Sequence, residues 1–556
     1  MQYDILVIGS GPGGYVAAIR AAQLGKKVAL VEKAEAGGVC LNWGCIPTKA
    51  LLKSAQVYRH CLEAAQYGLQ LEGTVTPDLA AIVKRSRTVA ETMSKGIQFL
   101  LKKNAIDLIQ GFGRIVAPHT VEVEGVQYEA EHIILATGAR PREMAFMPID
   151  GEHILSSKEA LLLEKLPTSM IVVGSGAIGS ELAWFYAALG VKVTIIEYLP
   201  RLMPLEDEEV SKTMERAFRK LRATVLTATT VKAARVVEDH CEVDIEGKKG
   251  AETLTADIVL SAVGIAANIE GIGLEEAGVK TERGKVVVDD YYRTSAEGIY
   301  AIGDIIPTPA LAHVASAEAI CCVEAICGLN PAKIDYTTIP SCIFTSPEVA
   351  SVGLTEQQAQ EKGIAYKVGR FPFTASGKAT AAGERDGFVK LLFDEEERLI
   401  GAHMVGGSVT EMLCEPTLAK QLGVTAHQIA RTIHAHPSMN EAMMEAAEAA
   451  FAIPRDMPGK RLCDRIATAC EADESKAVAH GPKGSAAIYA IRGYERGEVL
   501  RPEANTNLMS PRTVIPTLHA AIPAGTTTLV CAVWCDAGDN VPNEIPEEVL
   551  NIAQQS

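Results

Sequence analysis

The feature that most constrains this chain is a strand–glycine turn–helix–strand pattern that occurs twice. In the first copy, an apolar run at residues 4–8 leads through a glycine turn and a helical stretch to a second strand that ends at Glu32. In the second copy, residues 170–173 lead through the same segments to Glu197. The first glycine precedes the acid by 23 residues in both copies (32 − 9 and 197 − 174). We therefore predict two βαβ units of parallel sheet. The repeated glycines are Gly9, Gly11 and Gly14, then Gly174, Gly176 and Gly179.

This pattern is typical of dinucleotide binding. Glycines permit a tight turn and let the backbone approach a pyrophosphate at the helix N-terminus, while the acid can accept a hydrogen bond from a ribose hydroxyl. A single match could equally be a packing turn, but two copies with matched spacing predict two bound dinucleotides. Three further apolar strands end in glycine, which suits close passage of the backbone along a ligand. They end at Thr137-Gly138, at Gly264 and at Gly303-Asp304, where Asp304 could bond a polyol hydroxyl or cap a helix.

Length and composition limit the remaining classes of protein. The chain has 556 residues, and 48% hydrophobic with 22% charged residues exclude a disordered chain. The net charge of −16 argues against nucleic-acid binding, which depends on Lys and Arg. No apolar run approaches the roughly 18 residues that span a bilayer, and no basic signal segment opens the chain. We expect no membrane contact and a cytoplasmic location. Thirteen scattered cysteines do not form the pattern of a structural disulfide framework.

A second motif contains two cysteines in the run Gly-Gly-Val-Cys40-Leu-Asn-Trp-Gly-Cys45-Ile-Pro47-Thr-Lys49. Their spacing fits one helical turn, which would place both sulfurs on one face within disulfide reach. A helix starting near Pro47, together with Lys49, would lower a thiol pKa and favour the thiolate. Two other interpretations stay open, namely a pair of small buried side chains or two zinc ligands with distant partners. Because no second Cys or His pair lies close in sequence, we expect no metal site.

A flavin would explain why a cysteine pair accompanies nucleotide sites. A nicotinamide transfers hydride, a disulfide reacts by thiol exchange, and a flavin couples the two. Near the other end of the chain, His434-Ala-His436-Pro437 precedes Glu441. We expect Pro437 to begin a helix, with His436 at its entry and Glu441 bonded to one ring nitrogen. His436 is then a candidate general acid/base for a thiol. Taken alone, such a histidine is more often a cap or an interface residue.

Together these residues resemble the flavoprotein disulfide reductases, and among them most closely the dihydrolipoamide dehydrogenases. The resemblance covers about residues 1–459 and rests mainly on the cysteine run and the histidine run. It implies an α/β fold with two Rossmann-like dinucleotide-binding domains, an α+β dimerisation domain and a homodimer. The implied boundaries are 1–145 and 268–338 for the FAD domain, 146–267 for the NAD domain, 339–459 for the dimerisation domain and 460–556 for a C-terminal extension of unassigned role.

The resemblance also implies roles for individual residues. Cys45 would lie next to the flavin and Cys40 would exchange with the substrate. His436, paired with Glu441, would act as the base from the other subunit. Lys49 would lie near the flavin and pair with Glu181. The implied FAD contacts are Gly9, Gly11, Gly14, Glu32, Lys49, Gly113, Thr137, Gly138, Asp304, Ala310, Leu311, Ala312 and His313. The implied NAD contacts are Gly174, Gly176, Gly179, Glu181, Glu197, Val231 and Gly264.

The implied reaction is the oxidation of protein-bound dihydrolipoamide through a Cys40–Cys45 disulfide and FAD, with reduction of NAD+. The implied partners are lipoyl domains of 2-oxo-acid dehydrogenase or glycine-cleavage complexes. Mercuric reductases carry a terminal cysteine pair that residues 551–556 lack, and Glu197 would repel the 2′-phosphate of the NADP that glutathione reductases prefer. A mercuric- or glutathione-reductase-like enzyme and a non-catalytic scaffold subunit remain the alternatives. Residues 264–268 read Gly-Ile-Ala-Ala-Asn where the family often has Gly-Arg-x-Pro-Asn.

Overall fold

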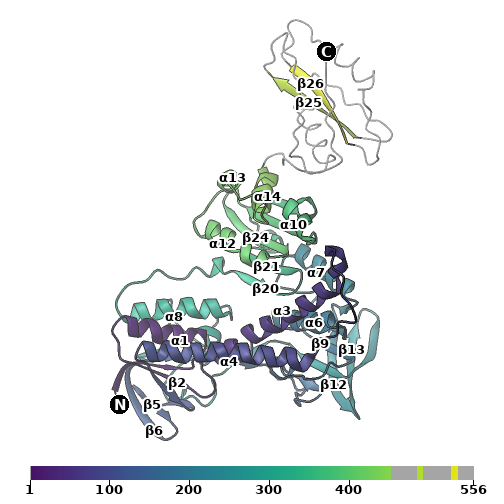
Figure 1. The fold of residues 1–556 in the computed structure, drawn as a ribbon. Coiled ribbons are helices and arrows are strands. Elements are labelled where there is room, and N and C mark those ends of the chain that lie inside the picture. The colour runs from purple at the N-terminus through teal and green to yellow at the C-terminus, as the bar shows by residue number, and fades with distance from the viewer. Residues whose placement is uncertain (1, 452–484, 493–527, 536–556) are drawn as a thin grey trace. The chain divides into compact units, whose positions relative to one another are not determined.

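The computed structural model describes residues 2–451, 485–492 and 528–535 (Figure 1). The chain forms two compact units. The first comprises residues 2–363 and 401–421, and the second comprises residues 364–400 and the described residues from 422 onward. Most of residues 460–556, the expected extension, lies outside the described residues. Within that extension the structure describes an antiparallel hairpin of β25 (Ser485–Arg492) and β26 (Thr528–Cys535).

The first glycine pattern builds one sheet of the first unit. Its strands follow the order β3-β2-β1-β6-β5-β4, and β19 also pairs with β6. The strands β1, β2, β3, β6 and β19 pair in parallel, whereas β4, β5 and β6 form an antiparallel ribbon. Helices α1 and α8 lie side by side, with α4 close to α1 (Figure 1). The bounds are β1 (Gln2–Ile8), α1 (Pro12–Gln23), β2 (Val28–Glu32), α4 (Leu79–Lys103), β3 (Asp107–Gln110), β4 (Gly113–Ala117), β5 (Thr120–Val123), β6 (Val126–Leu135), β19 (Ile299–Ala301) and α8 (Ala312–Ile326).

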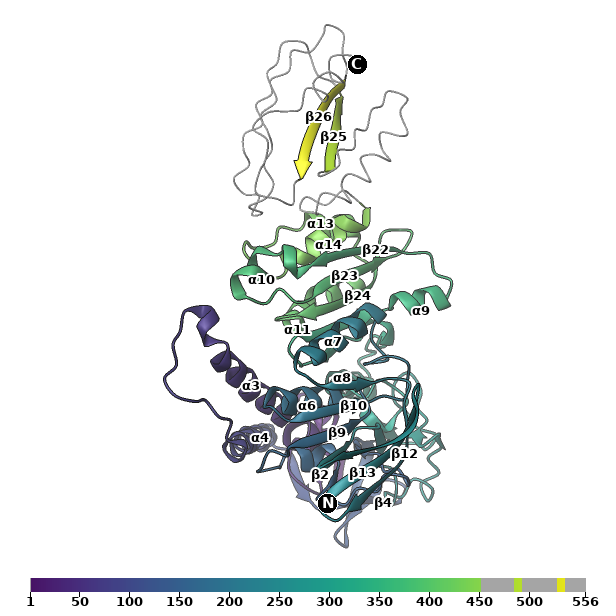
Figure 2. The ribbon, with the colours of Figure 1, turned by 90° about the vertical axis from the view of Figure 1, so that its right-hand side faces the viewer.

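The second glycine pattern builds another parallel sheet in the same unit, with the order β11-β10-β9-β15-β8. Helix α6 lies along β9 and β10 (Figure 2). An antiparallel meander of β12, β13 and β14 follows. Both predicted βαβ units are therefore confirmed. The bounds are β8 (Ile154–Leu155), α5 (Ser157–Ala160), β9 (Ser169–Val173), α6 (Ala177–Ala188), β10 (Lys192–Ile196), α7 (Glu208–Lys220), β11 (Thr224–Leu226), β12 (Thr230–Val237), β13 (His240–Gly247), β14 (Gly250–Ala256) and β15 (Ile258–Ser261).

The strands of the expected dimerisation domain, residues 339–459, occur in both units. In the first unit, β21 (Glu348–Gly353) pairs antiparallel with β20 (Ser341–Ile343) and with residues 401–406 of β24 (Leu399–Gly406). In the second unit, β22 and β23 pair antiparallel, and α14 packs on both. At Gly369 of β22 a methyl group would stand 1.7 Å from the carbonyl oxygen of Ala446, so only glycine permits this approach. The second-unit bounds are β22 (Lys367–Pro372), α10 (Gly377–Ala382), β23 (Phe388–Phe393), α13 (Ala426–Arg431) and α14 (Glu441–Phe451).

Two of the repeated glycines are required by packing in each nucleotide unit. A methyl group at Gly14 would stand 1.7 Å from the carbonyl oxygen of Gly9, and one at Gly179 would stand 2.1 Å from that of Gly174. Gly9 and Gly174 themselves have φ near +100°, a backbone angle that residues other than glycine rarely adopt. The first and third glycines thus set how closely each helix approaches its strand.

We expect Gly179→Ala to destabilise the protein by about 1–3 kcal/mol, because the new methyl group must push α6 away from the turn. Gly176→Ala is the matched control, since a methyl group at Gly176 meets no heavy atom within 4 Å. Thermal unfolding followed by circular dichroism measures both variants. Equal melting temperatures for the two would contradict the packing role of Gly179.

Candidate active site

The acid at the end of each second strand holds the glycine turn of its own unit. Glu32 accepts hydrogen bonds from the backbone N–H and the hydroxyl of Ser10, at 2.9 and 2.6 Å. Glu197 does the same with Ser175, at 2.9 and 2.7 Å. In both units the second carboxylate oxygen accepts the N–H two residues further along. All four of these side chains are buried. Sequence reasoning missed the serines, although the Gly-Ser-Gly shared by both copies could have revealed them.

The residues around these turns fit two dinucleotides. A methyl group at Gly11 or Gly176 would meet no heavy atom within 4 Å, yet it would fill the space at the helix N-terminus that a pyrophosphate needs. A carboxylate offers about four acceptor positions. Glu32 and Glu197 each use three of these positions inside the protein, which leaves about one for a ribose hydroxyl.

The two cysteines lie on two helices rather than on one. Cys40 belongs to α2 (Gly38–Asn42), and Cys45 is the first residue of α3 (Cys45–Leu62). The expectation that a single helical turn joins them is wrong, because the chain leaves helical geometry at Trp43 and Gly44. Both thiols are free, and they share a hydrogen bond. The break between the helices, not helical periodicity, therefore brings the sulfurs together.

The surroundings favour a thiolate at Cys45. The hydrogen bond from Cys40 has the largest effect and, with the charge of Lys49, lowers the pKa of Cys45 to about 7, against the opposing effects of burial and of Glu181. The same hydrogen bond raises the pKa of Cys40, and burial raises it further. Cys45 also begins α3, where the free N–H groups of the helix favour negative charge. These shifts favour the thiolate at Cys45 and the thiol at Cys40.

An ion pair joins the cysteine helix to the second nucleotide unit. The Lys49 ammonium on α3 donates to both carboxylate oxygens of Glu181 on α6, at 3.0 and 2.8 Å. The Glu181 side chain is only 5% exposed, so the charge depends on this partner. Glu181 also accepts the N–H of Phe344 at 2.9 Å, and the Phe344 ring lies 4.5 Å from the ammonium. The pairing that the resemblance implied is present.

The histidine motif lies in the second unit. His436 Nδ1 and Glu441 Oε1 are 2.8 Å apart, and the other carboxylate oxygen of Glu441 accepts the N–H of Ser438. The expected contact between histidine and acid is therefore present. The expectation that Pro437 begins the helix is wrong, because α14 begins at Glu441 and residues 437–440 form a non-helical segment before it. The His436 side chain is exposed, with 69% of its surface accessible.

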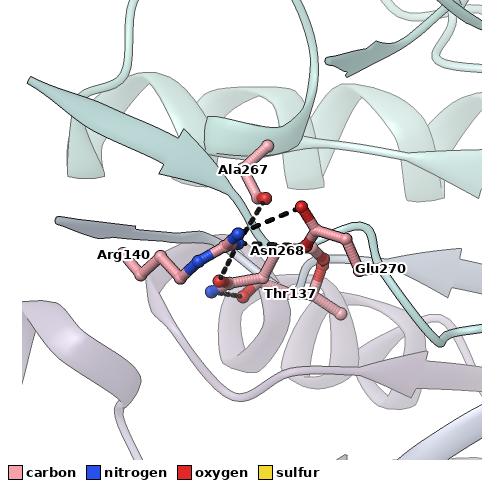
Figure 3. A network of polar contacts seen from close by, with 5 residues as sticks. All are labelled: Thr137, Arg140, Ala267, Asn268 and Glu270. Carbon is pink, nitrogen blue, oxygen red and sulfur yellow. Dashed lines mark hydrogen bonds and ion pairs between the residues drawn. The ribbon is translucent and has the colours of Figure 1, made fainter. Parts of the chain in front are cut away.

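Two short strands connect the nucleotide units. β7 (Ala139–Pro141) and β16 (Ile265–Ala267) pair antiparallel, with Gly264 at one end of the ladder and Thr137-Gly138 at the other. Figure 3 shows the contacts beside it. The Thr137 hydroxyl donates to the Asn268 carbonyl at 2.6 Å, and the Asn268 amide donates to the Thr137 carbonyl at 3.0 Å. Arg140 donates to the Ala267 carbonyl and pairs with Glu270. The segment that departs from the family pattern is thus tied to a predicted FAD contact.

The structure also places the other implied FAD contacts. Asp304 lies in a 3-10 turn (Gly303–Ile305), and Leu311 caps α8, so Asp304 does not cap that helix. Burial raises the pKa of Asp304, while the neighbouring Lys285 opposes this rise. Gly113 begins β4, and the run from Ala310 to His313 leads into α8. On the NAD side, the Val231 side chain packs in the hydrophobic core beside β13.

Comparison with known proteins identifies the family. The model described as pyridine nucleotide-disulphide oxidoreductase matches residues 3–319, and its dimerisation domain matches residues 339–447. The chain belongs to this family. It is an oxidoreductase that uses FAD and NAD and forms a homodimer. A further model, the DUF2264 C-terminal domain, matches residues 411–545 and so extends into the C-terminal region.

Similar proteins cover nearly the whole family region. The dihydrolipoyl dehydrogenase of Rhizobium etli is 46% identical over 476 residues, which are 81% of this chain and 98% of the relative. That of Bacillus subtilis is 45% identical over 465 residues, with 81% and 98% covered. Among solved structures, LpdA from Mycobacterium tuberculosis has a TM-score of 0.76 at 28% identity, covering 81% of this chain and all of that one. The flavoprotein disulfide reductase RclA from Escherichia coli has a TM-score of 0.71 at 26% identity, covering 80% and 99%. These matches confirm the predicted α/β fold class.

None of the described helices combines the length and apolar character needed to cross a membrane. Within the part of the chain that the structure describes, no three His, Cys, Asp or Glu side chains are grouped to hold a metal ion.

We expect alkylation of the reduced cysteine pair by iodoacetamide to accelerate as the pH rises through about 7, because only the thiolate reacts. Lys49→Met should move this midpoint to higher pH, since the ammonium lowers the pKa of Cys45. Lys53→Met, an exposed residue of the same helix, is the control. Mass spectrometry of the FAD-loaded protein counts modification of both cysteines. An unchanged midpoint in Lys49→Met would show that its charge does not act on the pair.

Proposed function

We propose that this protein is an NAD-dependent dihydrolipoyl dehydrogenase that oxidises the dihydrolipoyl groups of lipoyl domains in 2-oxo-acid dehydrogenase or glycine-cleavage complexes. The single observation that carries the proposal is the Cys40–Cys45 pair, held beside the Lys49–Glu181 ion pair. Curated relatives with 43–48% identity carry the name dihydrolipoyl dehydrogenase. In the proposed division, residues 1–145 and 268–338 bind FAD, 146–267 bind NAD and 339–459 form the dimer.

The proposed substrate half-reaction is a thiol–disulfide exchange that begins with Cys40 and Cys45 joined as a disulfide. One substrate thiol loses its proton, and its thiolate attacks the sulfur of Cys40, so that Cys45 leaves as a thiolate. The second substrate thiolate then attacks the mixed disulfide, which closes the substrate disulfide and releases Cys40. Substrate loses two electrons, and the cysteines gain them. Bound FAD would supply the two-electron chemistry that links this dithiol to NAD+.

Lys49 and the start of α3 stabilise the thiolate that leaves. A leaving sulfur with a lowered pKa departs faster, and the pKa of Cys45 is about 7. Cys40, whose pKa is raised, keeps its proton, donates a hydrogen bond to the Cys45 thiolate and is the weaker leaving group. This asymmetry supports the assignment of Cys40 to exchange with substrate and of Cys45 to the flavin side.

His436 is the proposed base for the substrate thiols. Its bond to Glu441 orients the ring, and its exposure leaves the other ring nitrogen accessible to a partner. We propose that it serves the cysteine pair of the other subunit in the homodimer. The presence of Cys40, Cys45 and this His436–Glu441 pair argues against the alternative of a non-catalytic scaffold subunit.

A mixed dimer tests the shared site. Cys45→Ser and His436→Gln homodimers should each be nearly inactive, because one lacks the thiolate and the other the base. Unfolding and reassembling an equal mixture should restore about a quarter of wild-type dihydrolipoamide oxidation, since half of randomly paired dimers are mixed and each has one intact site of two.

Each variant reassembled alone is the control, and His434→Gln, two residues from the proposed base, should remain active. Reassembly is verified by mass measurement of the dimers. If mixed dimers form but gain no activity, then the base and the cysteines act within one chain, or His436 is not the base.

Cofactor choice depends on the buried charge of Glu197. We expect kcat/KM for NAD to exceed that for NADP by about 100-fold or more, because like charges brought together cost several kcal/mol. Glu197→Gln removes the charge but keeps an acceptor oxygen for Ser175, so it should reduce this preference. Steady-state kinetics with both nucleotides measure the ratio. A wild-type enzyme that used both equally would show that Glu197 does not face the ribose.

A further inference from the structure

The break between α2 and α3 is the structural feature on which the cysteine pair depends. At this break Gly44 approaches α2 so closely that a methyl group there would stand 3.2 Å from the Val39 carbonyl oxygen and 3.6 Å from Cys40 Cα. The N–H of Trp43 donates to that same Val39 carbonyl at 2.7 Å, which closes the end of α2. A small movement of this segment would therefore displace Cys40 relative to α3.

One side chain from outside the motif holds this break. Arg87 on α4 donates to the carbonyl oxygen of Asn42 at 2.5 Å, and its guanidinium lies 4.1 Å from the centre of the Trp43 ring. Asn42 is buried, and its side-chain amide donates to two further carbonyls, those of Ala36 and Gly38. Hydrogen bonds thus hold both the backbone carbonyl and the side chain of Asn42, the last residue of α2. Helix α2 also packs against α4.

Trp43 is held on more than one side. The ammonium of Lys158, on α5, lies 4.7 Å from the centre of the same ring, and the indole N–H donates to Glu35 at 3.2 Å. Cations near an aromatic face are attracted by its charge distribution, and the planar guanidinium of Arg87 can also donate to a carbonyl at the same time. Among the residues that the structure describes, Arg87 combines the ring contact with a bond to the backbone at the break.

We propose that Arg87 is a positioning residue for the redox pair. By holding the Asn42 carbonyl and the Trp43 ring, it fixes the break between α2 and α3. The Cys40 thiol is thereby kept against Cys45. The largest charge effects on the pKa values of the two thiols come from the thiols themselves and from Lys49 and Glu181, so the role inferred for Arg87 rests on its contacts at the break. The inference rests on the proposed function of the cysteine pair.

Arg87→Met tests this role in the FAD-loaded protein. The variant keeps most of the side-chain length but loses the donor and the charge, so Cys40 should donate less well to the Cys45 thiolate. We expect the pH midpoint for iodoacetamide alkylation of the reduced pair to rise by about one pH unit, since a hydrogen bond to the charged form is worth a shift of that order. The matched control is Arg85→Met. Arg85 lies on the same helix and also donates to a backbone carbonyl, that of Ala50, but within α3 and away from the break.

The flavin spectrum and the melting temperature show whether each variant is folded. A folded Arg87→Met protein with the wild-type midpoint would overturn the inference. If Arg87→Met does not retain FAD, Trp43→Leu decides, because it removes the ring contact and leaves Arg87 in place. Its midpoint should also rise, and an unchanged value would again overturn the inference. A wild-type pair without a thiolate near neutral pH would instead contradict the proposed function itself, so the two failures are distinguishable.

Discussion

The ion pair between Lys49 and Glu181 is the interaction on which the arrangement of this site depends. It joins the helix that begins with Cys45 to the glycine-turn helix of the second nucleotide unit, and Glu181 also accepts the backbone N–H of Phe344. Removing one partner would leave the other charge poorly solvated, which is strongly destabilising for a buried pair. The same ammonium lowers the pKa of Cys45. A single contact therefore serves both the architecture and the chemistry of the cysteines.

The two nucleotide units satisfy the polar groups of the glycine turn and of the buried acid in the same way. A glycine turn leaves several backbone N–H groups unpaired, and a buried carboxylate is costly unless hydrogen bonds satisfy it. Ser10 with Glu32, and Ser175 with Glu197, meet both needs through bonds between the turn and the next strand. The carboxylate that would contact a ribose is thus rigidly placed before any nucleotide binds. This pre-organisation reduces the ordering cost of binding.

Most of the elements could be predicted because their signals are local. The glycine spacing, the apolar strands and the terminal acids each lie within one βαβ unit, and both units are present as expected. The contact between His436 and Glu441 could also be predicted from the sequence, since the two residues are five positions apart. The predictions were wrong at helix ends, where local spacing does not show that one helix stops or another begins. Cys40 and Cys45 have helical spacing but lie on separate helices, and Pro437 precedes rather than begins its helix.

The class of fold, the two dinucleotide units and the residue types of the redox centre could be read from the amino-acid sequence alone. These follow from periodicity and from short motifs, which act over distances of a few residues. A role of Lys49 in lowering a thiol pKa was also predicted, but the folded structure was needed to show which contacts hold that centre in place. Lys49 meets Glu181 across 132 positions, and Arg87 reaches the Asn42 carbonyl across 45. No spacing rule predicts such contacts, because they depend on how separate helices pack. The pKa of Cys45 and the geometry of the helix break are therefore properties of the folded chain.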